Sequence, residues 1–229
     1  IHRPMAVQTV ARAVARALQL ETEDLVADLC CGTGLVAHEL LREVPLRNQI
    51  VAVDGSKAML DRVGEHLRIR TVEMDAMSFA EFPVRYDKIL LKDATAHFPD
   101  PSSLFRRLHE RLAAGGRLLV ADLAPESQTW LFKEARRRWE SLHRRPEEIA
   151  ALLEGAGLQA SVASVTVRQE LTLADRLELA RRRYMPVLAT FEEGELRARI
   201  DEVRERCAAA ESLEVAHRFD LVVGRRATA

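Results

Sequence analysis

Short apolar runs alternate with amphipathic segments along the first half of the chain, and this alternation constrains the possible folds most strongly. The apolar runs that are predicted to form strands are residues 25–29, 49–53, 70–74, 86–92 and 117–123. The segments that are predicted to form helices are residues 4–18, 35–42, 56–67 and 102–114. Because strands that alternate with helices pair in parallel through right-handed crossovers, the sequence predicts a doubly wound α/β sheet.

The C-terminal part of the chain departs from this alternation. Residues 161–171 and 213–223 alternate like strands, and the stretch 174–210 between them is helical with breaks near Pro186 and Gly194. Two further helices are predicted at residues 130–145 and 146–158. We therefore predict a seven-stranded sheet with a helical insertion between its last two strands.

The composition indicates one domain and narrows the range of functions. With 229 residues and 48% hydrophobic content, the chain is long enough for one buried core. We expect a single domain over residues 1–229 with a helical cap at 172–210, and, because residue 1 is Ile, missing N-terminal residues. The balance of 34 Lys and Arg against 35 Asp and Glu argues against nucleic acid or a lipid surface as partner.

The cysteine pattern and the lack of long apolar runs add further expectations. Three cysteines, two of them adjacent at Cys30 and Cys31, suit neither a disulfide framework nor a metal site. No run of apolar residues is long enough to span a membrane. We therefore expect no bound metal, no membrane association and a cytoplasmic location, while the oligomeric state stays open.

A glycine-containing loop between the first strand and the next helix carries the main chemical signal. Gly32 and Gly34 lack side chains where the chain turns, so a ligand can approach the backbone amides. Asp54 ends the second strand 20 positions after Gly34 (54 − 34), where such folds place a carboxylate against ribose hydroxyls. A nucleotide-like cofactor is therefore expected. Because Gly32-x-Gly34-x-x-Ala37 also fits a dinucleotide pattern, the glycines alone leave NAD open.

The run from Val26 to Gly34 resembles the first motif of the class I S-adenosylmethionine (SAM)-dependent methyltransferases. This resemblance implies that Asp28 binds the amino group of SAM, directly or through water. It also implies that the loop formed by Cys30, Gly32 and Gly34 packs against the methionine part of SAM. Cys30 takes the place of a usual glycine, as it does in some quinone-pathway relatives.

Two further motifs follow in the order typical of this family. Residues 51–60 resemble the second motif, in which the acid, here Asp54, holds the ribose. Residues 75–77 resemble the adenine-binding corner, whose carboxylate receives the exocyclic amine. The residues that the resemblance places beside the adenine are Gly55, Met59, Asp75, Ala76 and Met77.

Three later segments complete the resemblance. Residues 86–92, 94–98 and 112–122 are similar to the fourth-strand motif, the histidine-containing segment after it, and the entry into the fifth strand. The backbone of Lys92 is implied to receive the amino group of SAM. The ordered set implies a Rossmann-like fold with an antiparallel ending, SAM as cofactor and S-adenosylhomocysteine (SAH) as product.

His97 and Asp93 are the candidate catalytic residues. If the family alignment holds, the imidazole of His97 lies near the transferred methyl group, where it could accept a proton or orient a hydroxyl. A histidine that only packs at the entry to a helix is the alternative interpretation. Asp93 could serve instead as a substrate ligand or base.

The leading hypothesis is transfer of a methyl group from SAM to O, N or C of a small-molecule metabolite. RNA or protein is an alternative acceptor, because residues 136–138 and 181–183 are arginine triplets that precede aromatic side chains. A solvated helix face balanced by glutamates is the simpler explanation of those arginines. A SAM-binding enzyme of non-methylating chemistry is a further alternative. An NAD-dependent short-chain reductase would need a Tyr-x-x-x-Lys pair, which neither Tyr86 nor Tyr184 begins.

Overall fold

The structure, a computed structural model, describes residues 4–98, 100–127, 130–207 and 212–228. Contacts divide the chain into two compact units. The first unit consists of Ile1–Asp122, Arg145–Val165 and Phe219–Ala229, and the second of Leu123–Arg144 and Thr166–Arg218. The chain therefore leaves the first unit twice and returns to it twice.

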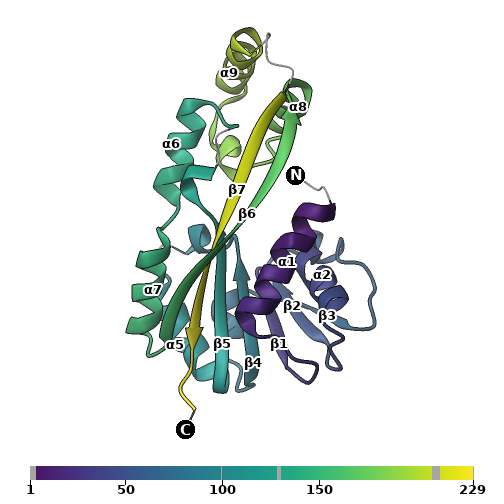
Figure 1. The fold of residues 1–229 in the computed structure, drawn as a ribbon, viewed down its shortest axis with the longest axis vertical. Coiled ribbons are helices and arrows are strands. Elements are labelled where there is room, and N and C mark those ends of the chain that lie inside the picture. The colour runs from purple at the N-terminus through teal and green to yellow at the C-terminus, as the bar shows by residue number, and fades with distance from the viewer. Residues whose placement is uncertain (1–3, 99, 128–129, 208–211, 229) are drawn as a thin grey trace. The chain divides into compact units, whose positions relative to one another are not determined.

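The described strands form a seven-stranded sheet in the order β3-β2-β1-β4-β5-β7-β6 (Figure 1). The pairs β2–β3, β1–β2, β1–β4 and β4–β5 are parallel. The strand order reverses between β1 and β4, which confirms the predicted doubly wound sheet. The strands are β1 (Val26–Leu29), β2 (Ile50–Asp54), β3 (Ile69–Glu73), β4 (Tyr86–Lys92), β5 (Leu112–Leu123), β6 (Gln159–Thr172) and β7 (Ser212–Arg225).

Helices cover the parallel strands of the first unit. Every residue of β1 is buried, and β2 and β4 are buried except near their ends, as in strands with both faces covered. Helix α1 packs against α2, and α5 packs against α7. No helix in the described ranges is both long and apolar enough to cross a membrane. The elements are α1 (Pro4–Leu18), α2 (Leu35–Glu43), α3 (Lys57–Leu60), α4 (Ala76–Phe79), the 3₁₀ turn η1 (Thr95–His97), α5 (Ser102–Arg111) and α7 (Pro146–Gly155).

Several predicted helices are longer than the observed ones, and the helix predicted over residues 130–145 spans only Lys133–Leu142. The helix expected over residues 56–67 is only the single turn α3, which ends at Leu60, and the left-handed φ of 74° at Gly64 keeps the chain from continuing as a helix. Leu67, the last residue of that predicted helix, is 93% exposed. The helix expected to reach residue 114 ends at Arg111, because the buried Leu112 already pairs with Tyr86 of β4.

The last strands make the sheet mixed. The amide of Arg226 donates to the carbonyl of Gly116 at 2.9 Å, and the amide of Ala124 donates to the carbonyl of Arg218 at 2.8 Å. Residue numbers thus fall along β7 as they rise along β5, so the two strands are antiparallel. Among the described residues between β6 and β7, the chain forms two helices and a 3₁₀ segment.

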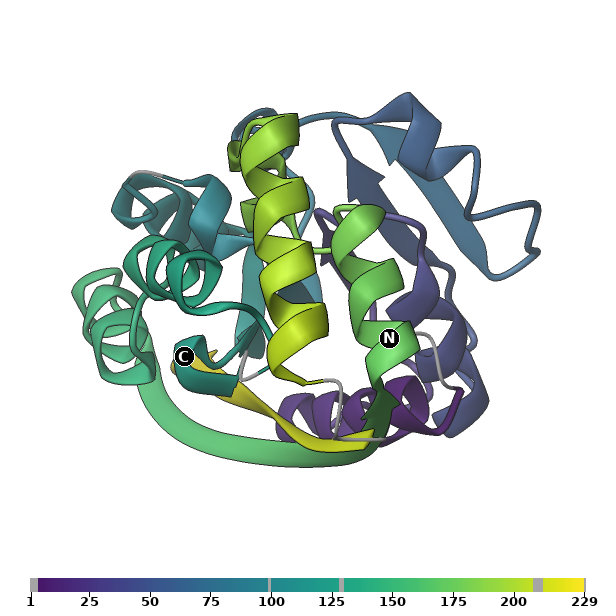
Figure 2. The same ribbon diagram turned by 90° about the horizontal axis from the view of Figure 1, so that it is seen from above.

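The second unit is helical apart from its portions of β6 and β7. Helices α8 and α9 lie side by side (Figure 2). A capping box between Thr172 and Asp175 starts α8. The predicted break at Pro186 falls in η3, whereas Gly194 lies in the first turn of α9 and breaks no helix. The elements are η2 (Pro125–Ser127), α6 (Lys133–Leu142), α8 (Leu173–Arg181), η3 (Pro186–Thr190) and α9 (Glu193–Arg206).

The packing of α5 gives a stability prediction with a matched control. Leu108 is fully buried in the main core cluster, so Leu108→Ala should lower the free energy of unfolding by about 2–5 kcal/mol. The same substitution at the exposed Leu67 should change it by less than about 0.5 kcal/mol. Urea denaturation followed by circular dichroism measures both values. Equal effects of the two substitutions would contradict the assigned core.

Candidate functional site

The carboxyl ends of β1, β2 and β4 meet at the point where the strand order reverses. In open α/β sheets, ligands bind at this edge. Two non-glycine residues here have left-handed backbone conformations: Cys30 directly after β1 with φ 56°, and Asp93 directly after β4 with φ 51°. Because such conformations are costly and collect at functional sites, they mark this edge as the candidate site.

The loop after β1 is held against β2 by backbone hydrogen bonds. The amide of Cys31 donates to the carbonyl of Val53 at 3.0 Å, and the amide of Gly32 donates to Oδ2 of Asp54 at 2.8 Å. The amide of Gly34 closes the turn onto the carbonyl of Cys31 at 3.0 Å. The two motifs that the sequence separates by about twenty residues are therefore one hydrogen-bonded assembly.

The two loop glycines are required for different reasons. Both have left-handed φ values, 56° at Gly32 and 68° at Gly34. A Cβ at Gly34 would lie 2.9 Å from Cγ1 of Val63, so this glycine permits close packing at the start of α2. A Cβ at Gly32 would meet nothing within 4 Å and would project into open space. Only Gly32 thus leaves room for a ligand beside the backbone.

Asp28 is a buried carboxyl group without a complete set of partners. It is 2% exposed, and its Oδ2 has no hydrogen-bond partner among the described residues. Its neighbours across the sheet are Ala52 and Leu90, which offer no polar side chain. Burial raises the pKa of Asp28 from 3.8 to about 7; the positive charge of Lys92 opposes this rise, and the carboxylate of Asp54 adds to it. An unsatisfied buried acid of this kind is suited to receive a cationic group from a ligand.

Asp54 and Asp75 are the next acids along this edge, and both are partly engaged. Oδ1 of Asp54 accepts from the amide of Ser56 at 2.8 Å, while its Oδ2 accepts from Gly32. Oδ1 of Asp75 accepts from the amides of Met77 and Ser78, and its Oδ2 accepts from the Ser78 hydroxyl at 2.6 Å. The hydroxyl bond from Ser78, the largest cause, and these amide bonds lower the pKa of Asp75. Asp75 therefore caps α4 and is ionised at neutral pH.

The other expected adenine neighbours lie on the same loops. Met59 is in the short helix α3 and is 41% exposed, and Gly55 is exposed directly after β2. Ala76 and Met77 begin α4, with Ala76 buried and Met77 half-buried. An exposed, flexible thioether at the mouth of this edge is available to cover a flat ligand.

The surroundings of the adjacent cysteines disfavour the thiolate form of both. Burial raises the pKa of Cys30 to about 12, and it also raises the pKa of Cys31, with the nearby carboxylates adding to both effects. Cys30 packs against the main core cluster. Both thiols therefore stay protonated at neutral pH. Among the described residues, no three His, Cys, Asp or Glu side chains are grouped so that they could hold a metal ion.

Lys92, Asp93 and His97 follow one another at the end of β4 and in the turn after it. The ammonium of Lys92 pairs with the carboxylate of Asp93 and lies 5.1 Å from the centre of the Phe219 ring. His97 is exposed at the end of η1, and its amide donates to the carbonyl of Ala94 at 3.0 Å. The ammonium group of Lys92, and not only its backbone, thus belongs to the site.

Asp122 is a site residue that the sequence analysis missed. It lies near the end of β5, is 6% exposed, and accepts hydrogen bonds from the amide of Ala94 and the hydroxyl of Thr95. Burial, the main cause, raises its pKa to about 6. The available signal was an acid at the carboxyl end of an otherwise apolar strand that was expected beside the fourth strand.

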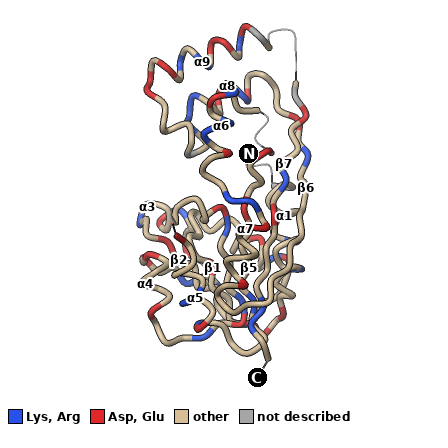
Figure 3. Tube along the Cα trace, turned by 90° about the vertical axis from the view of Figure 1, so that its left-hand side faces the viewer, with Lys and Arg blue, Asp and Glu red and all other residues tan. Residues whose placement is uncertain are grey.

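Most residues of the two arginine triplets form ion pairs inside the second unit. Arg136 pairs with Glu140, and Arg138 pairs with Glu134 and Glu195 and stacks on a phenylalanine ring. Arg181, Arg182 and Arg183 also pair with glutamates. Figure 3 shows basic and acidic residues interspersed along α9. This mixture of charges favours a solvated surface whose charges pair with one another, and it argues against a basic stripe that binds RNA.

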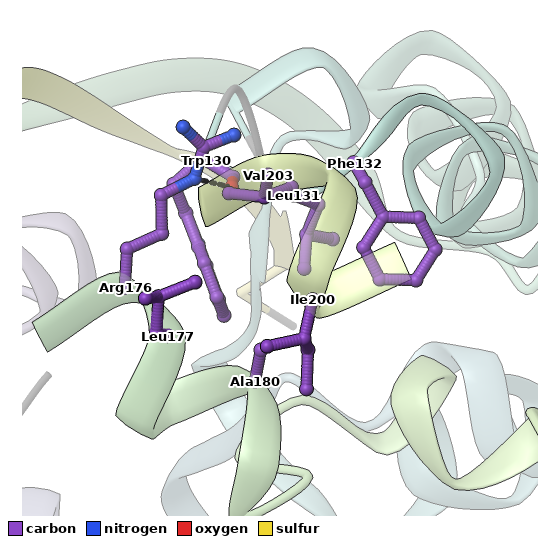
Figure 4. Close-up of a pocket in the computed structure, with 8 residues that line it drawn as sticks. All are labelled: Trp130, Leu131, Phe132, Arg176, Leu177, Ala180, Ile200 and Val203. Atoms are coloured by element: carbon purple, nitrogen blue, oxygen red, sulfur yellow. Dashed lines mark hydrogen bonds between the residues drawn. The ribbon is translucent and has the colours of Figure 1, made fainter. Parts of the chain in front are cut away.

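A small apolar pocket lies within the second unit (Figure 4). Arg176 borders it and donates to the carbonyl of Trp130 at 2.5 Å, while Phe132 and Ile200 contribute apolar side chains. Its volume of about 10 Å³ holds roughly one water molecule. This pocket is therefore too small to accept a metabolite in the conformation described.

Comparisons with known proteins agree with the geometry. A family model described as a methyltransferase domain matches residues 2–161. A 2-phytyl-1,4-naphtoquinone methyltransferase of Synechococcus elongatus is 29% identical over 107 residues, which cover 44% of this chain and 46% of that protein. The chain spans about half the length of the curated relatives it matches.

Solved structures show the same fold. A candidate methyltransferase from Bacillus halodurans C-125 has a TM-score of 0.64 and 18% identity, covering 95% of this chain and 99% of that one. Phosphoethanolamine N-methyltransferase 2 of Haemonchus contortus, solved with SAM, has a TM-score of 0.61 and 18% identity, covering 96% and 52%. Because the family model covers more than half of the residues, the chain belongs to the methyltransferase domain family.

Proposed function

We propose that this protein transfers a methyl group from SAM to a small-molecule acceptor. The proposal is carried by the buried Oδ2 of Asp28 in β1, which has no partner among the described residues, together with the following loop, where the Gly32 backbone borders open space. Two more acids, Asp54 and Asp75, follow along the same edge. This arrangement suits a ligand with a cationic amino group at one end and a nucleoside at the other.

The hydrogen-bonding capacity of the three acids fits the parts of SAM. Asp28 would receive the amino group, which supplies the partner that its Oδ2 lacks. A carboxylate has about four acceptor positions, and Asp54 uses one on each oxygen, so each oxygen can still accept one ribose hydroxyl. Asp75 uses three of these positions and keeps about one for the exocyclic amine of adenine.

The other residues that are expected to contact SAM would form the walls of its binding site. Met59 and Gly55 would flank the adenine ring from one side, and Ala76 and Met77 would border it at the start of α4. Cys30, held protonated, would pack beside the methionine part. The carbonyl of Lys92 would add a second acceptor for the amino group.

The chemistry then depends mainly on placement. When bound, SAM supplies a methyl group on a sulfonium that is already activated for transfer. The residues of this chain need to hold the acceptor in line and to keep water away. His97 would accept a proton from the acceptor or orient it, and Asp93 would be a second ligand or base. The Lys92 ammonium would favour an acceptor oxygen in its ionised form.

A small molecule is the acceptor class that the charges favour. Described arginines of the second unit pair with glutamates, which leaves little basic surface for RNA. The cyanobacterial relative is named for a naphthoquinone substrate, which is also a small molecule. The helical segment 172–210 stays our predicted cap for the acceptor.

Calorimetry with SAH tests the cofactor proposal. Wild-type protein should bind SAH with a dissociation constant on the order of micromolar. Asp54→Asn should weaken binding by about tenfold to a hundredfold, because a charged hydrogen-bond partner is lost. Asp61→Asn, which removes an exposed carboxylate paired with Lys57, is the control and should bind like the wild type. No heat of SAH or SAM binding to the wild type would sink the proposal.

Mass spectrometry tests the reaction itself. Incubation with SAM and a library of candidate metabolites should yield a product in which one methyl group replaces a hydrogen. SAH should form in equal amount. A product without an added methyl group would instead support non-methylating chemistry, and methylation of added RNA alone would exclude a small-molecule acceptor.

The buried acid predicts an unusual pH dependence of stability. Because the pKa of Asp28 is raised from 3.8 to about 7, the unfolded chain loses this proton first, and stability falls as pH rises through this range. The shift corresponds to at most about 4 kcal/mol. Asp28→Asn, which cannot ionise, should gain stability relative to the wild type between pH 5 and pH 8. Urea denaturation of both ligand-free proteins at pH 5 and at pH 8 measures their difference in stability. A difference that is the same at both pH values would contradict the prediction.

The same carboxyl group should make cofactor binding pH-dependent. Below pH 7 Asp28 must lose its proton before it can bind the ammonium group of SAH. The affinity for SAH should therefore fall by about tenfold for each unit by which the pH is lowered below 7. Above pH 7 the affinity should level off. Titration calorimetry in buffers of different ionisation enthalpy would detect the released proton. Asp28→Asn should bind SAH weakly at every pH, and retention of the slope in this variant would contradict the assignment.

A further inference from the structure

We propose that Asp122 is a positioning residue, which fixes the turn from Asp93 to His97 so that both candidate catalytic side chains face the acceptor. This inference rests on the proposed methyl transfer. Asp122 lies on β5, whereas the turn that it holds follows β4. Three hydrogen bonds, one strained residue and the burial of the contact support this role.

Two successive residues of β5 hold the turn. The carbonyl of Ala121 accepts from the amide of Asp93 at 2.9 Å. Oδ1 of Asp122 accepts from the amide of Ala94 at 3.2 Å, and its Oδ2 accepts from the hydroxyl of Thr95. Three consecutive residues after β4 are therefore each bound to β5, and η1 begins at the last of them.

The backbone of Asp93 needs this support. Its φ of 51° is left-handed, a conformation that a residue with a Cβ keeps only when its surroundings impose it. The bond at its own amide and the bond at the next amide restrain the peptide units on both sides. Without the Asp122 carboxylate, the bond at the amide of Ala94 would be lost, and Asp93 could relax toward an ordinary conformation.

Burial makes these bonds hard to replace. Asp122 is 6% exposed, Thr95 is 2% exposed and Ala94 is 1% exposed, so water has little access to the contact. The ionised carboxylate makes shorter and stronger hydrogen bonds than a neutral side chain. Burial and the nearby Asp93 carboxylate oppose its ionisation, while Lys92 and the two hydrogen bonds favour it.

Loss of the Asp122 contact should lower turnover without changing cofactor binding. Of the expected cofactor ligands, Asp28 lies in β1, Asp54 ends β2 and Asp75 follows β3, and the hydrogen bonds that the structure describes for these acids go to residues other than Asp122. Loss of the Asp122 contact should therefore displace Asp93 and His97 and leave the cofactor acids in place. A displaced reacting group lowers kcat while the affinity for the cofactor stays the same.

The test uses variants that weaken the contact with little change of shape. Asp122→Asn removes the negative charge and keeps one acceptor oxygen, so it weakens the contact, whereas Thr95→Val removes the hydroxyl bond alone. Thr95→Ser retains the hydroxyl, and Asp87→Asn is the matched control. Asp87, near the amino end of β4, accepts from the amide of Leu25 at 2.8 Å, so this variant weakens a similar bond at the other end of the strand from the turn. If Asp122→Asn fails to fold, Thr95→Val provides the same measurement.

Three measurements decide the outcome: SAH affinity by calorimetry, hydrogen exchange of a peptide covering residues 93–98, and kcat with the acceptor found by mass spectrometry. Asp122→Asn and Thr95→Val should exchange faster and lose about tenfold to a hundredfold in kcat, with SAH affinity within about twofold of the wild type. Thr95→Ser should recover most of kcat. The acid limb of the pH dependence of kcat should also differ between Asp122→Asn and the wild type.

The outcomes separate this inference from the proposed function. Failure of the wild type to bind SAH would contradict methyl transfer itself. Normal SAH binding together with unchanged kcat in Asp122→Asn would overturn only the positioning role. An equal loss of kcat in Asp87→Asn would also overturn it, because the effect would then reflect general loss of stability.

Discussion

The burial of β1 between β2 and β4 is the constraint on which the rest of the structure depends. Because both faces and both edges of this strand are covered, Asp28 near its end has only apolar strand neighbours. The chain must then leave the sheet through a tight turn, which Gly32 and Gly34 make possible with left-handed backbones. The same burial that stabilises the sheet therefore creates the unsatisfied acid at its edge.

Carboxyl groups outnumber positive charges at this edge of the sheet, and this imbalance affects which ligand can bind there. Asp28, Asp54, Asp93 and Asp122 gather at the ends of four neighbouring strands, with the Lys92 ammonium among them. One cation cannot neutralise four acids, so the ligand-free edge disfavours ionisation of the buried carboxyl groups. A ligand that carries positive charge relieves this cost, which is the physical basis for expecting SAM there.

The sequence predicted the parallel strands well, because each depends on a local apolar run between turn residues. It predicted the loop and the acids Asp28, Asp54 and Asp75 by position along the chain, and the structure places them along one edge of the sheet. It failed after α3, where the left-handed Gly64 keeps the chain from continuing as a helix, and at the start of β5, where pairing with Tyr86 overrides the helical pattern. Both failures occur where a contact distant in sequence, or a single backbone conformation, outweighs periodicity.

By itself the sequence determined the order of strands and helices, the turn chemistry of the glycines and the family resemblance, since these are properties of neighbouring residues. Only the tertiary structure decided that Oδ2 of Asp28 lacks a partner, that Gly32 rather than Gly34 borders open space, and that Asp122 holds the turn after β4. Each of these facts depends on groups brought together from separate strands. Burial and hydrogen-bond satisfaction are set by such neighbours in space, and no local pattern records them.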